Sequence, residues 1–177
     1  SLVAYAIIFR SLFANDGLVN YVLVNLGILD KPYNFLTQPF AAKIVIILAL
    51  LWRWTGYNMV FFLSGLQNIE YSVYEAAKID GASAIQTFFK ITVPLLKPTI
   101  LLTAIMSTNG TLQLFDESIN LTDGGPANAS ISMSHYIYNL CFKYVPNFGY
   151  AAAMSFFILL LVAVLAFIQM RVGDKRD

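Results

Sequence analysis

Long apolar runs alternate with short polar interruptions along this chain, and two of the runs are long enough to cross a membrane. Phe40 to Leu63 and Tyr150 to Gln169 each reach the length of roughly twenty residues that a helix needs to span a bilayer. A third span is predicted to begin near Pro94 and to contain the apolar stretch Ile100 to Met106. Leu2 to Phe13 is apolar but too short to cross, so we interpret it as the end of a span whose beginning is missing.

The segments between these runs carry turn-forming and polar residues. Asn20 to Pro39 is predicted to be a connection with one short helix at the membrane surface, because it contains Gly27, Asp30, Pro32 and Pro39. Thr122 to Pro126 reads TDGGP and predicts a turn, and Ser132 to Phe142 has helical periodicity. Arg171 to Asp177 is a charged tail.

A charged polar interruption between two apolar runs is Glu75 to Pro94, which reads EAAKIDGASAIQTFFKITVP. A charge at the bilayer centre costs at least about 2.5 kcal/mol, so the four charged residues of this stretch place it in water. Ile85, Phe88 and Phe89 are spaced i, i+3, i+4 and share one helical face. Gly81 divides the segment, which predicts two short helices with a corner between them, the second helix having an apolar face.

Composition and charge agree with a membrane protein and exclude several functions. Of the 177 residues 58% are hydrophobic and only 12% charged, which is too little charge to cover the surface of a soluble domain. The predicted fold class is therefore an all-α, polytopic helical membrane bundle. A net charge of +1 gives no basic surface for nucleic acid. Cys141 and His135 are each the only residue of their kind, so neither a disulfide nor a metal site is expected.

Basic residues predict the orientation in the membrane. Lys78, Lys90 and Lys97 flank the 75–94 loop, and three more basic residues lie in the tail, whereas the two opposite loops have one each. The positive-inside rule therefore places the 75–94 loop and the C-terminus in the cytoplasm.

Polar residues within the spans need protein or water as a partner, because lipid offers none. Asn109, Gln113 and Asp116 are spaced i, i+4, i+7 and would form one stripe of a helix, with Glu117 beside it. Arg53 lies deep in the Phe40–Leu63 span and has two interpretations: a snorkelling side chain in an aromatic belt, or a residue that faces a translocation path.

The 75–94 loop resembles the "EAA" loop of ABC-importer permeases, whose pattern is EAA-x3-G-x9-I-x-LP. Only Val93, in place of leucine, departs from that pattern. In that family the loop is a cytoplasmic coupling helix docked in a cleft of the ATP-hydrolysing subunit. The resemblance implies that the chain is the C-terminal part of one permease domain and that these loop residues couple it to the ATPase: Glu75, Ala76, Ala77, Asp80, Gly81, Ile85, Phe88, Phe89 and Pro94.

A second resemblance points to the carbohydrate-uptake permeases of the lactose, multiple-sugar, maltose and glycerol-3-phosphate type. Phe115-Asp116 followed by Leu121 to Pro126 is similar to the FD…LTxGGP tract of that group. It implies two ATP-binding subunits, which bind ATP and Mg, a second, homologous permease, an extracytoplasmic binding protein, and a place in the bacterial inner membrane. This chain itself would bind no cofactor and would have no catalytic residue.

A sugar needs hydrogen-bonding groups for its hydroxyls and aromatic faces for its ring. Candidates for the first are Asn109, Gln113, Asp116 and Glu117, and candidates for the second are Trp52, Tyr57 and Tyr150. Each has a simpler interpretation, as a helix–helix contact, a solvated residue at the outer mouth or an interfacial anchor. Two alternative functions are a permease for a solute other than sugar and a fragment of an ion-driven secondary transporter. A membrane-embedded enzyme is disfavoured, because it would need a cluster of histidines or carboxylates and His135 is the only histidine.

Overall fold

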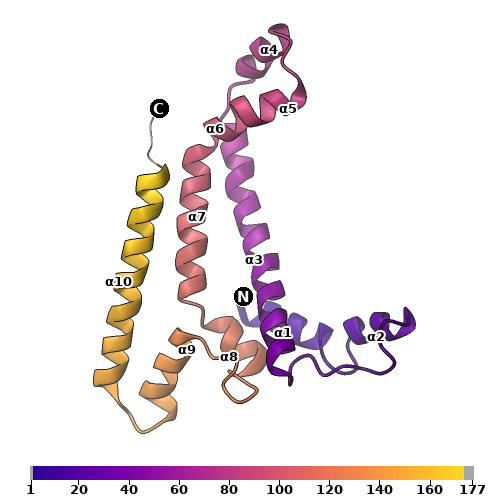
Figure 1. Ribbon diagram of the computed structural model, residues 1–177, viewed down its shortest axis with the longest axis vertical. Coiled ribbons are helices and arrows are strands. Elements are labelled where there is room, and N and C mark those ends of the chain that lie inside the picture. Colours follow the sequence, from indigo (N-terminus) through magenta and orange to yellow (C-terminus); the bar gives the residue numbers. More distant parts are fainter. Residues whose placement is uncertain (1, 174–177) are drawn as a thin grey trace. The chain divides into compact units, whose positions relative to one another are not determined.

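A computed structural model describes residues 2–173, and within that range the chain is helical with no strand (Figure 1). This confirms the predicted all-α fold class. Residues 174–177 of the predicted charged tail lie outside the described range. The helices, including two short π-helices (η), are α1 (Leu2–Leu12), α2 (Leu18–Asn25), α3 (Pro39–Gln67), α4 (Tyr71–Ile79), α5 (Ala84–Thr87), η1 (Phe88–Thr92), α6 (Val93–Leu95), α7 (Lys97–Leu112), α8 (Asp116–Thr122), α9 (Met133–Tyr138), η2 (Asn139–Lys143) and α10 (Phe148–Gly173).

Two helices are long and apolar enough to cross a membrane. They are α3, with 29 residues, and α10, with 26, and they confirm the spans predicted at 40–63 and 150–169. At 1.5 Å per residue α3 is about 43 Å long, more than the hydrocarbon thickness of about 30 Å. The segment from Ala84 to Leu112 is a third candidate, because its two halves meet the same criteria together but are bent by 65°.

The described chain divides into two compact units, and α3, α7 and α10 each contribute to both. One unit contains residues 1–53 and 110–160, and the other contains residues 54–109 and 161–177. The core of the first unit joins α1, α3 and α8 through Tyr5, Ala6, Ile46, Ala49 and Leu121. Alanines on the facing sides of α1 and α3 have no exposed surface, and such small residues allow the helix backbones to approach closely.

In the second unit, polar side chains join α7 to α3 and to α10. The amide of Asn58 donates to Oγ of Ser107 at 3.1 Å, and the amide of Gln169 donates to Oγ1 of Thr108 at 2.8 Å. Ser107 and Thr108, two polar residues within the predicted third span, thus have protein partners, as the sequence analysis expects of polar residues that lipid cannot satisfy. Such bonds hold spans together where lipid removes the hydrophobic driving force between helices.

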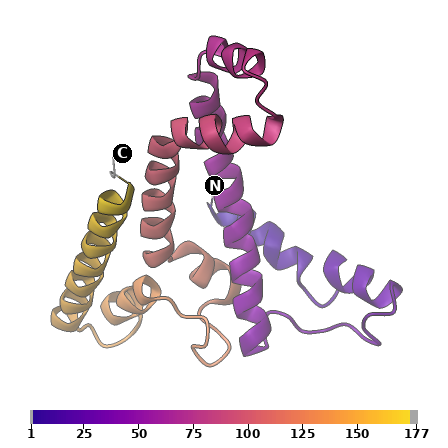
Figure 2. The same cartoon turned by 45° about the horizontal axis from the view of Figure 1, so that its top comes forward.

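The 75–94 loop folds into the predicted pair of short helices, which Figure 2 shows beyond the end of α3. Gly81 follows α4 with a φ of +75°, a left-handed conformation that other L-residues adopt only with strain. Ser83 begins α5 with a capping box: its hydroxyl accepts from the N–H of Gln86, whose side chain accepts from the N–H of Ser83.

The second helix of the loop widens into η1 immediately before Pro94. A proline lacks the backbone N–H and its ring clashes with the carbonyl four residues earlier, so an α-helix is strained there. In η1 the N–H of Val93 bonds to Phe88, five residues back, which widens the turn before the proline ring. This π-helix was not predicted from the sequence.

One sequence prediction is wrong. Asn109, Gln113 and Asp116 do not form one helical stripe, because α7 ends at Leu112 and Asp116 starts the separate helix α8. The two acidic residues of the first turn of α8 explain the new start, since carboxylates there interact favourably with the helix dipole.

Gly65 of α3 allows close contact with the base of α7, and this contact can be tested. A Cβ on Gly65 would lie 2.8 Å from Cδ2 of Leu96 and 2.9 Å from Oγ1 of Thr99, whereas a Cβ on Gly56 of the same helix meets nothing within 4 Å. We expect Gly65→Val to lower stability by about 1–3 kcal/mol through overpacking, and Gly56→Val to change it by about 0.5 kcal/mol or less. Thermal unfolding in detergent measures both, and equal effects would contradict the contact.

Candidate functional site

An uncovered apolar surface lies on the second helix of the 75–94 loop. Ile85 of α5 is 72% exposed, and Phe88 and Phe89 of η1 are 51% and 65% exposed. The two phenylalanine rings meet edge to face with centroids 5.0 Å apart. We call Ile85, Phe88 and Phe89 the loop surface. The sequence predicted that these three side chains share a face, and all three are exposed, as expected of a surface that a partner covers.

The other predicted coupling residues lie around this surface on the same loop. Glu75, Ala76 and Asp80 are exposed, whereas Ala77 is buried on the inner side of α4. Pro94 is exposed at the start of α6. The loop therefore presents apolar side chains outward together with charges of both signs, the acidic Glu75 and Asp80 and the basic Lys78 and Lys90.

A buried carboxylate in the first unit connects three helices. Glu117 of α8 is 1% exposed, and its Oε1 accepts hydrogen bonds from the Tyr5 hydroxyl of α1, at 2.6 Å, and from the Arg53 guanidinium of α3. We call Tyr5, Arg53 and Glu117 the Glu117 cluster. The sequence left two interpretations of Arg53, a snorkelling side chain or a residue facing a translocation path. The cluster favours neither, because the guanidinium bonds to a buried acid of its own chain.

Aromatic rings border the Glu117 cluster. The ring of Trp52 stacks with that of Tyr5 at a centroid distance of 6.2 Å and lies 5.7 Å from that of Phe9. Of the residues predicted for the substrate path, the structure thus brings Trp52 and Glu117 to the same neighbourhood through Tyr5. Asp116 is half-buried at the start of α8, and the remaining four are exposed in part or in full: Tyr57, Asn109, Gln113 and Tyr150.

A buried serine–histidine pair organises the turn after α8. Nδ1 of His135 lies 2.8 Å from Oγ of Ser118, which also accepts from the N–H of Ser132 and donates to the carbonyl of Ser130. Asp123 lies 3.8 Å from Nε2 of His135 and accepts from Lys143 at 2.9 Å. Ser118 and His135 are both fully buried, so this arrangement is a structural support rather than an accessible nucleophile.

The pKa values of two groups in this turn are shifted by their surroundings. Burial lowers the pKa of His135, although the carboxylate of Asp123 acts to raise it. The hydrogen bond from Lys143 lowers the pKa of Asp123. Among residues 2–173 no three histidine, cysteine, aspartate or glutamate side chains come together as a metal site would require.

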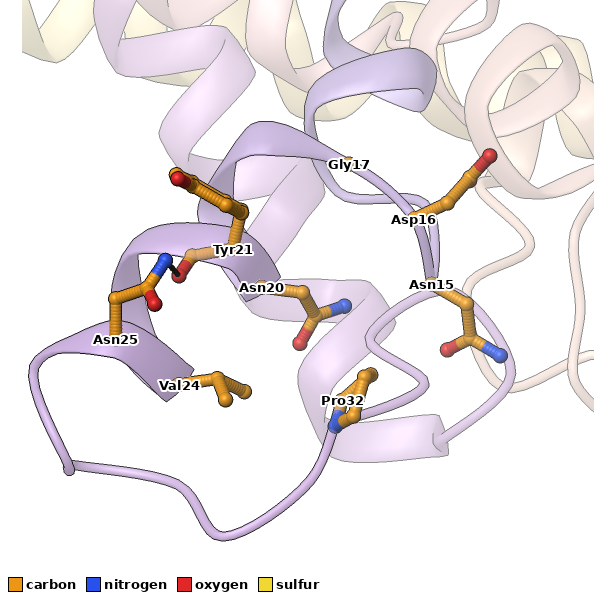
Figure 3. A pocket seen from close by; sticks show the side chains of 8 residues that line it. All are labelled: Asn15, Asp16, Gly17, Asn20, Tyr21, Val24, Asn25 and Pro32. Atoms are coloured by element: carbon orange, nitrogen blue, oxygen red, sulfur yellow. Dashed lines mark hydrogen bonds between the residues drawn. The ribbon is translucent and has the colours of Figure 1, made fainter.

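A shallow pocket of about 260 Å³ lies between α2 and the loops that flank it (Figure 3). Asn20 is fixed below it: its side-chain amide donates to the carbonyls of Ala14 and Tyr33, and its oxygen accepts from the N–H of Tyr33. Asn25 donates to the carbonyl of Tyr21. These polar side chains thus stabilise the connection between α1 and α3. The sequence predicted that this connection contains one short helix.

The long apolar helices, the bent entrance to α7 and the exposed loop between α3 and α7 are typical of a helical membrane protein. The family model of the binding-protein-dependent transport system inner membrane component matches residues 2–176. The chain belongs to this family, which confirms the resemblance to ABC-importer permeases drawn from the sequence.

Curated relatives and a solved structure agree. The chain is 55% identical over 178 residues to the lactose transport system permease protein LacF of Rhizobium radiobacter, covering 99% of this chain and 60% of that protein. It is 37% identical over 160 residues to the trehalose/maltose transport system permease protein MalF of Thermococcus litoralis, covering 90% of this chain and 53% of that protein. A crystal structure of a bacterial ABC transporter involved in the import of the acidic polysaccharide alginate matches with a TM-score of 0.85 at 25% identity. That match covers 98% of this chain and 60% of the other, so the chain spans little more than half the length of these relatives.

The Glu117 cluster can be tested as a unit. Removing one partner of a buried ion pair leaves the other uncompensated and costs about 3–5 kcal/mol, whereas replacing both with apolar groups is often neutral. We therefore expect Arg53→Met to destabilise the protein strongly and the double variant Arg53→Met/Glu117→Leu to recover most of the loss. Unfolding in detergent measures the cycle, and additive losses would contradict the pairing.

The buried histidine predicts a pH dependence of the turn at 123–132. Because the pKa of His135 is lower in the folded chain than its ordinary value of 6.5, the unfolded chain binds the proton more readily. Stability from this group is therefore complete above about pH 6.5 and is lost as the pH falls through the lower, folded pKa. Hydrogen exchange of the turn should rise on acidification after correction for intrinsic rates. His135→Asn has an amide that can bond Ser118 but does not titrate, so the same rise in that variant would contradict the assignment.

Proposed function

We propose that this chain forms part of the permease subunit of an ATP-driven importer and lines the path of a sugar or sugar derivative. The relatives named for lactose and for trehalose/maltose transport support a carbohydrate cargo. The observation that carries the proposal is the exposed loop surface, on the segment that matches the EAA pattern of ABC-importer permeases.

The loop surface is proposed to dock in a cleft of a cytoplasmic ATP-binding subunit. Burying three such side chains contributes roughly 5–8 kcal/mol before the cost of ordering, which is enough to hold a loop during a conformational change. The exposed Glu75 is proposed to pair with a basic group at the edge of the cleft. ATP and Mg would be bound by the partner subunit, whose closure would move the loop.

The remaining partners follow from the same proposal. A related solved structure shows an alginate ABC transporter in complex with a periplasmic protein that carries an alginate pentasaccharide. For this chain we propose a corresponding extracytoplasmic binding protein and a second, homologous permease subunit. The 75–94 loop and the C-terminus are then cytoplasmic, and the turn after α8 lies on the opposite side.

The proposed solute path uses the side chains that the sequence predicts for a sugar. Asn109, Gln113 and Asp116 would contact hydroxyl groups, and Trp52, Tyr57 and Tyr150 would offer aromatic faces. Glu117 would contribute through position, because its carboxylate already accepts from Tyr5 and Arg53 and thereby fixes α8.

Reconstitution of the full permease with its ATP-binding subunits and binding protein tests the proposal. ATP hydrolysis that rises with sugar-loaded binding protein supports a carbohydrate importer, and hydrolysis that rises only with another solute points to a different cargo. Transport driven by an ion gradient without ATP would indicate a secondary transporter instead. Labelling of Lys78→Cys from the outer side of the membrane would overturn the proposed orientation.

The corner at Gly81 offers a sharp test of coupling. A Cβ there would meet nothing within 4 Å, so a substitution acts through the left-handed backbone, with φ of +75°, and not through a clash. We expect Gly81→Val to abolish uptake while the permease still inserts into the membrane, because a β-branched residue opposes the corner that orients α5.

Gly27 provides a matched control, since its φ is +69° and it also has open space around it. Gly27→Val imposes the same kind of backbone strain outside the loop and should leave uptake largely intact. Uptake by cells that carry each variant, normalised to the amount of permease in the membrane, measures the effect. Normal uptake by Gly81→Val would contradict docking through this loop.

A further inference from the structure

The two helices of the 75–94 loop are joined at a second point besides the Gly81 corner. The hydroxyl of Tyr74 on α4 lies 3.2 Å from Oγ1 of Thr92, the last residue of η1. These residues are 18 positions apart in sequence, and they stand before and after the loop surface in the chain. Tyr74 is half-buried and Thr92 is buried, so water competes little for this hydrogen bond.

Thr92 is also fixed from the other side. Its hydroxyl is within 3.4 Å of the carbonyl of Thr87, so it can donate there while it accepts from Tyr74. The hydroxyl of Tyr74, the hydroxyl of Thr92 and the carbonyl of Thr87 thus form a chain of hydrogen bonds from α4 to the widened turn of η1. This turn immediately precedes α6 and the 65° bend into α7.

Apart from this bond, the described hydrogen bonds that orient the α5–η1 segment relative to α4 lie at the corner itself. There the N–H of Ala82 bonds to the carbonyl of Ala77 at 3.0 Å, and that of Gly81 to Lys78 at 3.2 Å. A single corner centred on glycine permits rotation, because glycine has the widest backbone freedom. The Tyr74–Thr92 hydrogen bond is a second attachment, on the far side of the loop surface. Two attachment points restrict the rotation of α4 relative to the α5–η1 segment.

We propose that the Tyr74–Thr92 hydrogen bond is a positioning contact for coupling, which makes α4 and η1 move as one body when a partner displaces the loop surface. The inference rests on the proposed function, since it assumes that the loop is the point at which an ATP-binding subunit acts. Tyr74 and Thr92 touch neither solute nor nucleotide in this proposal. They transmit displacement from the loop surface to α3, which precedes α4, and to α7.

The test uses the reconstituted complex of full permease, ATP-binding subunits and binding protein, with the solute that stimulates it. Tyr74→Phe and Thr92→Val each remove one hydroxyl and keep the shape of the side chain. We expect each to reduce solute transported per ATP hydrolysed by about fivefold, the effect of one hydrogen bond of ordinary net strength. The double variant should lose no more than Thr92→Val alone, because Thr92→Val already removes the hydrogen bond to Tyr74 together with the weaker one to Thr87.

Tyr71→Phe is the matched control, because Tyr71 lies one turn earlier on α4 and is exposed. It should leave the transport-to-ATP ratio unchanged. A second readout is the distance distribution between spin labels at Lys78→Cys and Lys90→Cys, in a background without other reactive cysteines. This distribution should broaden in Tyr74→Phe and stay narrow in Tyr71→Phe.

The outcomes separate the inference from the proposed function. A normal ratio and a narrow distribution in Tyr74→Phe would overturn the inference, as would an equal loss in Tyr71→Phe or additive losses in the double variant. Loss of the ATP-binding subunits from Tyr74→Phe complexes would also overturn it, because the contact would then serve assembly and not coupling. If the wild-type complex itself shows no ATP-dependent transport, the proposed function fails, and the inference fails with it.

Discussion

Hydrocarbon offers no hydrogen-bond partner, and this constraint explains the polar contacts of the membrane-embedded helices. Ser107 of α7 is paired with Asn58 of α3, and Thr108 of α7 with Gln169 of α10. In water such bonds add little net stability, since each replaces bonds to solvent. Between apolar helices in lipid they supply attraction and register that burial of leucine or valine cannot, because lipid tails are equally apolar.

In the 75–94 loop, water hydrates the charged side chains, whereas the exposed apolar side chains are unfavourable in water. The loop surface is exposed, so burial of these residues cannot be what holds the loop in shape. Local devices do that: the left-handed Gly81, the capping box of Ser83 and the hydroxyl contact between Tyr74 and Thr92. A loop stabilised in this way can present an apolar surface without collapsing onto it.

The sequence predicted those features that depend on neighbouring residues. Long apolar runs predicted α3 and α10, and a glycine between polar helical segments predicted the corner of the loop. The interaction of Arg53 could not be predicted, because its partner Glu117 is 64 residues away in the chain. The prediction that Asn109, Gln113 and Asp116 form one helical stripe was wrong, because α7 ends at Leu112 and no proline in the sequence marks that end. The tyrosine within the apolar run at residues 2–13 does indicate a polar partner, because a buried tyrosine hydroxyl usually finds one.

Side chains whose hydrogen bonds are already made within the protein are poor sites for a solute. A carboxylate that already accepts from an arginine and a tyrosine, and that is 1% exposed, has little capacity left for a sugar hydroxyl. Opening that site to a solute would break bonds that fix α8 against α1 and α3, at a cost that weak hydroxyl contacts do not recover. An exposed aromatic such as Tyr150 needs no such rearrangement. An exposed side chain is therefore better placed to contact a solute than this carboxylate, which holds α8 against α1 and α3.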